Sequence, residues 1–271
     1  MPTQILSLNH ISAGVAGKNI LRNVTIRVAP GEVHAVMGPN GSGKSTLASV
    51  TMGSPVYALS ADRSGISIGK AELTGLPAEE RARRGLFLAF QSPAAVPGVS
   101  VMQLLRAAYQ ELHSTGMTDG TGNGVQNPVL SRRWKAADTS LVEFSEAVRD
   151  QARALDIDEA LLNRGINDGF SGGERKKMEI LQALVLKPKF AIFDEIDTGL
   201  DVDALRIVAA GIRTLRRRGT GCIIITHYLR ILRYIRPDRV HVIVGGRLIR
   251  SGGWQLARQI EKRGYADLTD R

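Results

Sequence analysis

The chain has 271 residues, of which 43% are hydrophobic and 23% are charged, a balance typical of a globular protein with a substantial core. It carries 36 Lys and Arg against 26 Asp and Glu, a formal net charge of +10, and its one cysteine excludes an internal disulfide or a four-cysteine metal cage. Since no run of about 18 apolar residues and no basic, apolar leader is present, we expect no membrane span, no secretory signal and a cytoplasmic location.

The first forty residues alternate apolar and polar positions, which predicts β-strands. The alternation is clear over Val24–Val28, breaks at Pro30 and Gly31, and resumes over Val33–Met37. This second strand runs directly into the glycine-rich segment Gly38–Ser45, and a helical pattern follows. The predicted order is therefore strand, glycine loop, helix.

The glycine-rich segment matches the phosphate-binding pattern G-x-x-x-x-G-K-[ST]. Glycines let backbone N–H groups turn toward phosphate oxygens, and the helix that follows presents its positive dipole end to the same anion. We expect Lys44 to reach the β- and γ-phosphates and Ser45 to ligate Mg²⁺. The candidate nucleotide-binding residues of this segment are Gly38, Pro39, Asn40, Gly41, Ser42, Gly43, Lys44, Ser45 and Thr46.

Helical patterns dominate residues 92–169, for example over Val101–Leu112 and Leu141–Leu155. The stretch Gly116–Asn127, rich in Gly, Asn and Thr, interrupts them and is interpreted as a surface insertion. We therefore expect residues 92–169 to form a helical subdomain inserted into one domain of residues 1–271.

Strand-like apolar runs return at Phe190–Phe193, Ile223–Ile225 and Val240–Val244, with a helical pattern near Asp203–Arg218 between the first two. Strands that alternate with helices predict a largely parallel sheet. Residues 1–91 and 170–271 are expected to form the catalytic α/β core around it.

Two acids, Asp194 and Glu195, follow the apolar run at Phe190–Phe193, at the sheet edge where α/β proteins bind ligands. Asp194 is suited to the Mg²⁺ shell, and Glu195 to deprotonate or orient an attacking water. Acids are also common at helix starts, so the pair by itself is equally compatible with a helix cap. The phosphate loop upstream favours the catalytic interpretation.

A second glycine motif, Ser171-Gly172-Gly173-Glu174, precedes another helical run. Ser171 and Glu174 fit the S-x-x-E capping box, so the motif alone predicts no more than a well-capped helix start.

The string Phe170–Glu174 also has the form of the signature motif of ABC ATPases, and it lies between the glycine loop and the carboxylate pair, as in that family. Gln91 resembles the family's Q-loop glutamine, Asp201 its D-loop aspartate and His227 its H-loop histidine. On these motifs the chain is identified as a member of the ABC ATPase family. The resemblance implies an α/β fold of the P-loop NTPase type, with a RecA-like parallel-sheet core, an N-terminal antiparallel β subdomain and an inserted helical subdomain.

The resemblance also implies ATP and Mg²⁺ as cofactors and Mg²⁺-dependent ATP hydrolysis. Ser45, Gln91 and Asp194 are the implied metal-site residues. Glu195 is the implied general base, and His227 the contact to the γ-phosphate. The implied catalytic residues are Lys44, Gln91, Glu195 and His227.

The signature motif implies a head-to-tail pair of subunits. In the family, Ser171 and the adjacent Gly172 and Gly173 face the γ-phosphate held by another subunit's Lys44, so that two ATP molecules lie between the subunits. The free N–H groups of a helix N-terminus attract anions, which suits this role. Transient self-dimerisation on ATP is expected, and one chain should be a poor ATPase. The implied nucleotide contacts of this face are Ser171, Gly172, Gly173, Glu174 and Asp201.

Within the ABC ATPases, Asp194–Leu205 closely resembles SufC, the ATPase of the Suf iron–sulfur cluster assembly system, and Ile196 stands where transporter subunits usually carry Pro. Pro93–Gly98, Thr226–Leu232 and Gly264–Thr269 resemble SufC as well. The resemblance implies SufB- and SufD-like scaffold partners, docked on residues 92–169, and an ATP-driven change in that scaffold. The alternative is the nucleotide-binding subunit of a membrane ABC transporter.

The positions of the aromatic residues and of the single cysteine bear on how the chain would bind adenine and whether it could hold a cluster. Transporter subunits commonly stack adenine on an early aromatic residue, yet residues 1–56 contain no Phe, Tyr or Trp. The single Cys222 precedes three isoleucines and is expected to be a buried strand thiol. It does not supply the ligands that an iron–sulfur cluster takes, which agrees with an ATPase that does not hold the cluster.

The basic excess lies in the last quarter of the chain. Residues 206–271 hold 15 Lys and Arg and 4 Asp and Glu, a net charge of +11, whereas residues 1–205 sum to −1. The run Arg216–Arg218 lies where a helix is expected to end before Gly219, where cations complement the helix dipole. We interpret most of this charge as a solvated face and expect no nucleic-acid binding, with an acidic protein partner or the opposing subunit as the alternative.

Overall fold

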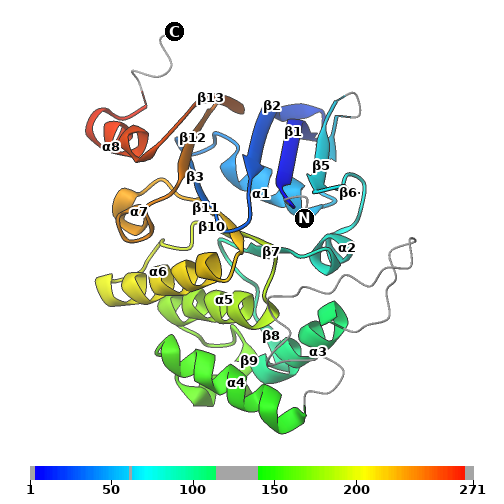
Figure 1. Ribbon diagram of the computed structural model, residues 1–271, viewed down its shortest axis with the longest axis vertical. Coiled ribbons are helices and arrows are strands. Elements are labelled where there is room, and N and C mark those ends of the chain that lie inside the picture. Colours follow the sequence, from blue (N-terminus) through cyan, green and yellow to red (C-terminus); the bar gives the residue numbers. More distant parts are fainter. Residues whose placement is uncertain (1–3, 61–62, 114–139, 266–271) are drawn as a thin grey trace.

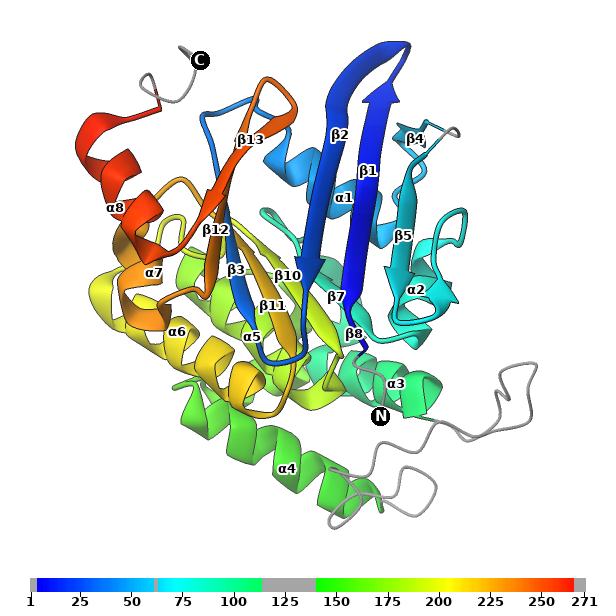
Figure 2. The same cartoon turned by 45° about the horizontal axis from the view of Figure 1, so that its top comes forward.

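The computed structural model describes residues 4–60, 63–113 and 140–265 of the chain (Figure 1). The expected fold class is confirmed, since an antiparallel sheet, a largely parallel sheet and a helical layer follow one another through the molecule (Figures 1 and 2). The Gly116–Asn127 stretch and the end of the Gly264–Thr269 segment lie outside the described residues.

The N-terminal sheet is antiparallel and has the strand order β2-β1-β5-β6, with β4 also paired to β1. Buried residues alternate along β1, but the phase changes from Leu8 to Ile11, where the pairing with β2 shifts its register and His10 adopts φ 51°. This irregularity acts as a bulge and keeps both halves of the strand facing the core. The strands are β1 (Leu6–Val15), β2 (Lys18–Val28), β4 (Ala58–Leu59), β5 (Gly65–Ile68) and β6 (Ala71–Glu72).

The central sheet has the order β13-β12-β3-β11-β10-β7. Its strands are parallel except β13, which runs antiparallel to β12. Three of the inner strands are mostly apolar and buried along their whole length, as is typical of parallel strands that are covered on both faces. The strands are β3 (Val33–Met37), β7 (Leu86–Ala89), β10 (Phe190–Asp194), β11 (Gly221–Ile225), β12 (Arg239–Val244) and β13 (Arg247–Gly252).

Two hydrophobic cores lie on opposite faces of the central sheet. One face packs against α1 and the antiparallel sheet, through residues such as Ile192 and Ile223. The other face packs against α5, α6 and α7, through neighbours such as Phe193 and Ile224. The helices outside residues 92–169 are α1 (Lys44–Met52), α2 (Ala78–Arg83), α5 (Gly172–Leu186), α6 (Val202–Arg217), α7 (Leu229–Ile235) and α8 (Trp254–Arg263).

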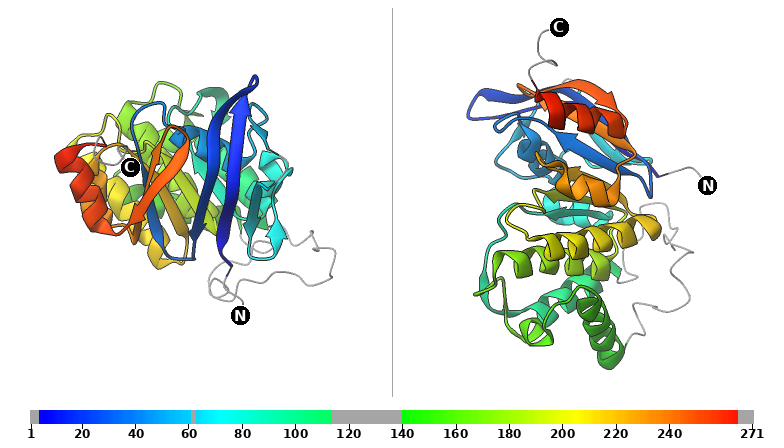
Figure 3. Two further views of the ribbon diagram at one scale, coloured as in Figure 1. Left: turned by 90° about the horizontal axis from the view of Figure 1, so that it is seen from above. Right: turned by 90° about the vertical axis from the view of Figure 1, so that its left-hand side faces the viewer.

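The described part of residues 92–169 forms a compact helical lobe against α5. The chain enters and leaves this lobe at adjacent positions, because Val96 pairs with Ile166 and Ser100 with Gly165. Figure 3 shows α4 at the end of the molecule farthest from the antiparallel sheet. The elements are β8 (Val96–Ser100), α3 (Val101–His113), α4 (Leu141–Ala154), the 3₁₀ helix η1 (Glu159–Asn163) and β9 (Gly165–Ile166).

Some arginines at the C-terminal end of α6 form hydrogen bonds with other parts of the chain. Arg216 donates to the carbonyl of Gly31 at 3.2 Å and to the Asp238 carboxylate at 2.7 Å, and Arg218 donates to the carbonyl of Leu184 at 3.3 Å. Most other arginines of the described C-terminal quarter are exposed, in agreement with a solvated face. Cys222 is fully buried, and this burial raises the pKa of its thiol to about 12.

None of the helices in the described ranges combines the length and the apolar composition that crossing a bilayer requires.

Candidate functional site

A cavity of about 730 Å³ opens where the parallel strands of the central sheet end. Five neighbouring strands contribute to it from their carboxyl ends: β3 leads into the glycine loop, β7 to Gln91, β10 to Glu195, β11 to His227 and β12 to Gly245. Ligands of α/β proteins bind at this edge of a sheet. The lining residues are Val15, Lys18, Asn19, Ile20, Asn40, Gly41, Ser42, Gly43, Lys44, Ser45, Thr46, Gln91, Glu195, His227, Gly245 and Gly246.

The glycine loop delivers the chain into α1 in a conformation that only glycine adopts without strain. Gly43 is the N-cap of α1 with φ 101°, and it provides no side-chain hydrogen bond to the helix N–H groups. These N–H groups are therefore left for a ligand, at the positive end of the helix dipole. The arrangement is suited to phosphate.

Lys44 is the first residue of α1, and only 5% of its surface is exposed. Its Nζ atom donates to the backbone carbonyls of Gly38 and Pro39, each at 2.9 Å. Burial lowers the pKa of the Lys44 ammonium from its usual value, while Glu195 and Asp194 act in the opposite direction. Gly38 and Pro39 thus support the lysine rather than line the cavity.

Asp194 ends β10 and is buried behind the loop. Burial raises the pKa of its carboxyl group, while Ser45 and Lys44 act against this. In the part of the chain that the structure describes, its Oδ1 atom is buried without a hydrogen-bond partner. An orphaned carboxylate oxygen beside a serine hydroxyl is the donor chemistry that Mg²⁺ prefers.

No group of three or more His, Cys, Asp or Glu side chains able to hold a metal ion occurs among the described residues. Where proteins bind Mg²⁺ at phosphate sites, they supply few oxygens of their own, and water and the substrate's phosphates complete the coordination. Ser45, Asp194 and the Gln91 amide oxygen therefore fit such an ion without a further acidic cluster.

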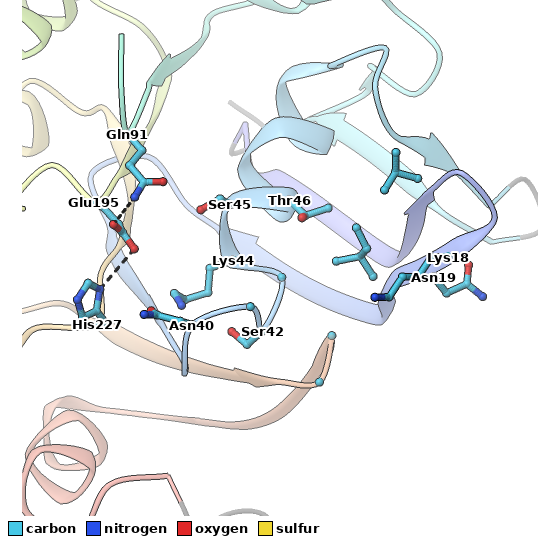
Figure 4. Close-up of a pocket in the computed structure, with 16 residues that line it drawn as sticks. Lys18, Asn19, Asn40, Ser42, Lys44, Ser45, Thr46, Gln91, Glu195 and His227 are labelled. Atoms are coloured by element: carbon cyan, nitrogen blue, oxygen red, sulfur yellow. Dashed lines mark hydrogen bonds and ion pairs between the residues drawn. The ribbon is translucent and has the colours of Figure 1, made fainter.

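Three of the expected catalytic side chains meet at one side of the cavity (Figure 4). Gln91 Nε2 donates to Glu195 Oε2 at 2.7 Å, and Glu195 Oε1 lies 3.4 Å from His227 Nδ1. Glu195 itself has φ 48°, in the left-handed region, and its N–H donates to the carbonyl of Ile225 at 2.9 Å. A residue held in this region of backbone space at a cavity wall is a common feature of functional sites.

His227 is supported by neighbours to which the sequence analysis gave no individual role. The hydroxyl of Thr226 lies 3.0 and 3.1 Å from the two carboxylate oxygens of Asp197, which is fully buried. Burial raises the pKa of Asp197, and the hydrogen bond to Thr226 acts against this. The rings of His227 and Tyr228 lie with their centroids 3.8 Å apart. The hydrogen bonds from Thr226 to Asp197 hold the loop after β11 against the loop after β10.

A buried ion pair on α5 holds the backbone around Gln91. Lys176 Nζ donates to the carbonyls of Phe90 at 3.1 Å and Gln91 at 2.8 Å, and Glu179 Oε1 accepts from the N–H of Phe90 at 2.8 Å. The two charges lie 3.6 Å apart, and burial raises the pKa of Glu179 to about 7. The helix that begins at Ser171 is thus linked to the cavity through Gln91.

The start of α5 forms the capping box that its sequence predicts. The Glu174 N–H donates to Ser171 Oγ at 3.2 Å, and the Ser171 N–H donates to Glu174 Oε2 at 2.7 Å. Asp201 caps α6 in a similar way by accepting from the Ala204 N–H at 2.7 Å. None of Ser171, Gly172, Gly173, Glu174 and Asp201 lines the cavity of its own chain.

The sequence interpretation missed the end of the cavity formed by Val15, Lys18, Asn19 and Ile20, and also the Gly245–Gly246 turn. The Gly-Gly pair between two apolar runs was an available turn signal. No local pattern marks the other four residues, because their approach to the glycine loop depends on the packing of β1 and β2.

Comparison with known proteins gives consistent matches. The family described as ABC transporter matches residues 21–198. "Vegetative protein 296" of Bacillus subtilis (strain 168) is 40% identical over 265 residues, which cover 98% of this chain and 93% of the relative. "Probable ATP-dependent transporter ycf16" of Cyanophora paradoxa is 42% identical over 265 residues, 97% of this chain and 94% of the relative.

A solved structure described as the ATP-binding subunit of an ABC transporter superposes with a TM-score of 0.74 at 25% identity. The match covers 99% of this chain and 100% of the solved one. The likeness therefore extends over both sheets and the helical lobe.

Proposed function

This chain belongs to the ABC transporter family and is an ATP-hydrolysing cassette, and within that family we propose that it is a SufC-like subunit. In this role it binds SufB- and SufD-like scaffold proteins and uses ATP-driven closure of two copies to change the scaffold's shape during iron–sulfur cluster assembly. We propose that the protein acts in the cytoplasm.

The observation that carries the SufC-like assignment is the packing of the two segments that resemble SufC. Ile196 and Asp197 are both fully buried, and the Asp197 carboxylate contacts Thr226, which directly precedes His227. Arg230 adds a hydrogen bond to the carbonyl of Leu200 at 3.0 Å. The two segments that resemble SufC thus form one hydrogen-bonded unit beside the catalytic groups. This arrangement supports the proposal that both segments contribute to function.

We propose that Glu195 acts as the general base or orienting group for the attacking water. Its hydrogen bond to Gln91 and its contact with His227 hold the carboxylate at one side of the cavity. Lys44 and the N–H groups of α1 neutralise charge on the β- and γ-phosphates. A bound Mg²⁺ held by Ser45, Gln91 and Asp194 would supply further neutralisation of phosphate charge.

We further propose that two copies complete each other's sites. Ser171, the glycines that follow it and Asp201 are well formed in a single chain, yet they lie outside its cavity. Because the hydroxyl of Ser171 accepts within its capping box, its proton stays available to a phosphate oxygen. In the proposed pair, these groups face the Lys44 of a second copy and contact the phosphate that this lysine binds.

The helical lobe, residues 92–169, is proposed as the subdomain inserted into a core of residues 1–91 and 170–271, and as the partner-docking part. Three large apolar side chains lie exposed beside Gln91 and along β8: Phe90 at 56%, Val96 at 45% and Val99 at 37%. Large apolar side chains exposed within a few residues of one another are candidates for a protein interface. Their position next to a catalytic residue would couple partner binding to hydrolysis.

The alternative, a nucleotide-binding subunit of a membrane transporter, is favoured by a specific observation: ycf16 and the solved structure are both described as transporter components. Either partner would engage the same lobe.

Co-purification distinguishes the two. The full-length tagged chain is expected to recover two scaffold proteins, identified by mass spectrometry as SufB- and SufD-like, and Val99→Asp, in the lobe, should lower their recovery at least about tenfold. Val56→Asp, an exposed apolar site on another part of the surface, is the matched control. Recovery of a multispanning permease without scaffold proteins would overturn the SufC-like assignment.

A further inference from the structure

The β10–α6 loop, residues 195–201, carries two groups with different proposed roles. Glu195 begins the loop and lines the cavity of its own chain, whereas Asp201 ends it and is exposed outside that cavity. The backbone that joins these two residues therefore sets how both carboxylates are placed.

Few backbone hydrogen bonds hold this loop in place. One turn closes within it, where the Thr198 N–H donates to the carbonyl of Glu195 at 3.2 Å. Gly199 follows with φ 77°, in a region that glycine occupies without strain. Among the residues that the structure describes, no backbone N–H donates to the carbonyls of Asp197 and Leu200. Because both residues are buried, carbonyls without any donor would cost free energy at these two positions.

Arg230, near the start of α7, supplies a donor to both carbonyls. Its Nη1 atom donates to the Leu200 carbonyl at 3.0 Å, and its Nη2 atom donates to the Asp197 carbonyl. The guanidinium group is planar and presents its donors in a fixed fork, so one side chain can bridge two carbonyls at a set spacing. A lysine ammonium is a point charge and lacks this fork. Arg230 thus holds the β10–α6 loop at its middle and at the residue before Asp201.

Arg230 is in turn placed by the residues that precede it. Its guanidinium carbon lies 5.5 Å from the centroid of the Tyr228 ring, and the Tyr228 and His227 ring centroids are 3.8 Å apart. A cation over an aromatic face is attracted to it. Thr226, the residue before His227, donates to the Asp197 carboxylate. The segment between β11 and α7 therefore carries His227 and also contacts the β10–α6 loop.

A simpler role for Arg230 is to neutralise the buried charge of Asp197. However, its Nε atom lies 3.9 Å from the Asp197 carboxylate, and its hydrogen bonds go to the two backbone carbonyls instead. The Thr226 hydroxyl lies closer to that carboxylate, at 3.0 and 3.1 Å from its two oxygens. The contacts therefore favour a role in backbone geometry, which depends on the shape of the side chain as well as its charge.

We propose that Arg230 is a positioning residue for ATP hydrolysis, which fixes the β10–α6 loop so that Glu195 faces the cavity of its own chain while Asp201 faces a second copy. This inference rests on the proposed function, because both carboxylates have their roles there. Arg230 does not line the cavity. Its replacement should therefore slow hydrolysis without weakening ATP binding, which depends on Lys44 and the N–H groups of α1.

Kinetic and binding measurements on full-length Arg230→Lys chains test the proposal. This variant keeps the charge but loses the fork, so kcat should fall about tenfold or more while the dissociation constant for ATP changes less than about twofold. Arg233→Lys makes the same change at an exposed arginine of α7 and is the matched control, with neither quantity expected to change. A wild-type kcat in Arg230→Lys would overturn the proposal.

Rescue of Arg230→Ala by free guanidinium separates positioning from a general contribution to folding. The Arg230 side chain is 41% exposed, so the ion can reach the space that the truncation leaves. Guanidinium chloride, well below denaturing concentrations, should restore part of the lost kcat, whereas sodium chloride at the same ionic strength should not. Equal effects of the two salts, or a loss of ATP binding in parallel with kcat, would contradict a positioning role. If Arg230→Ala does not fold, Arg230→Lys decides the question.

Glu195→Gln, measured beside these variants, keeps this inference separable from the proposed function. If Glu195→Gln hydrolyses ATP at the wild-type rate, the proposed function is contradicted. If Glu195→Gln is inactive and Arg230→Lys is unimpaired, only the role of Arg230 is contradicted.

Discussion

Two helices in this chain begin at glycine-rich turns, and the difference between them bears on the proposal that two copies complete each other's sites. The start of α1 has Gly43 as its N-cap and no side-chain hydrogen bond, so its N–H groups face the cavity uncapped. The start of α5 closes a capping box between Ser171 and Glu174 and lies outside that cavity. An uncapped helix start can hold a phosphate by itself, whereas a capped one offers fewer free donors. The α5 start thus suits a supporting contact to a phosphate held by another chain.

The two regions are nevertheless connected within one chain. The Lys176–Glu179 pair on α5 holds the backbone of Phe90 and Gln91, and Gln91 donates to Glu195. A displacement of α5 would therefore reach the Glu195 carboxylate through two hydrogen-bonded steps.

The largest expected effect comes from removing the cation at the α1 end. Lys44→Ala should lower kcat/KM for ATP by at least about a thousandfold, because the buried ammonium beside the phosphates has no substitute. Lys70→Ala, an exposed lysine in the turn between β5 and β6, is the control. Near-wild-type hydrolysis by Lys44→Ala chains would exclude this end of the cavity as the phosphate site.

A smaller loss that separates binding from chemistry is expected at Glu195. Glu195→Gln keeps the hydrogen-bonding shape but not the base, so kcat should fall about a hundredfold or more while ATP binding remains. With ATP present, the variant should elute from size-exclusion chromatography as a dimer. A variant that hydrolyses ATP at the wild-type rate, or that stays monomeric with ATP bound, would contradict the assigned role.

The Lys176–Glu179 pair, which connects the two regions, should make a pH-dependent contribution to stability. Burial raises the pKa of Glu179 from its ordinary 4.5 to about 7. Between these values the folded state keeps a proton that the unfolded state releases, so this contribution to stability is lost as pH rises through 7. Between pH 4.5 and 7 the wild type should therefore lose up to about 3 kcal/mol of unfolding free energy relative to Glu179→Gln.

Urea unfolding of both chains at pH 5 and pH 7.5 measures this difference. Glu146→Gln, at an exposed position of α4, is the matched control and should track the wild type. If the difference in unfolding free energy between wild type and Glu179→Gln is the same at both pH values, the raised pKa of Glu179 is contradicted.

Much of the fold and the site could be predicted from sequence because the signals are local. The strand, glycine loop and helix at residues 33–52 and the capping box at Ser171 each depend on a few adjacent residues, and all are present. The long-range features could not be predicted. Lys176 and Glu179 look like surface residues of a helix, and only the packing of α5 against the loop after β7 shows that they are buried.

The end of the cavity at Val15 and Ile20 escaped prediction for a related reason. Both residues belong to an ordinary alternating pattern, and Ile20 packs closely against the turn at Gly246, more than 200 positions away in the chain. The bulge at His10 likewise depends on the pairing of β1 with β2.

The central claim is that each ATP site combines the α1 end of one copy with the α5 end of another. Mixing equal amounts of Lys44→Ala and Ser171→Arg chains tests it most directly, because only a mixed dimer then contains one intact Lys44 site facing one intact Ser171. Each variant alone should be inactive, and the mixture should recover up to about one quarter of the wild-type ATPase rate. A mixture no more active than either variant alone would contradict the claim.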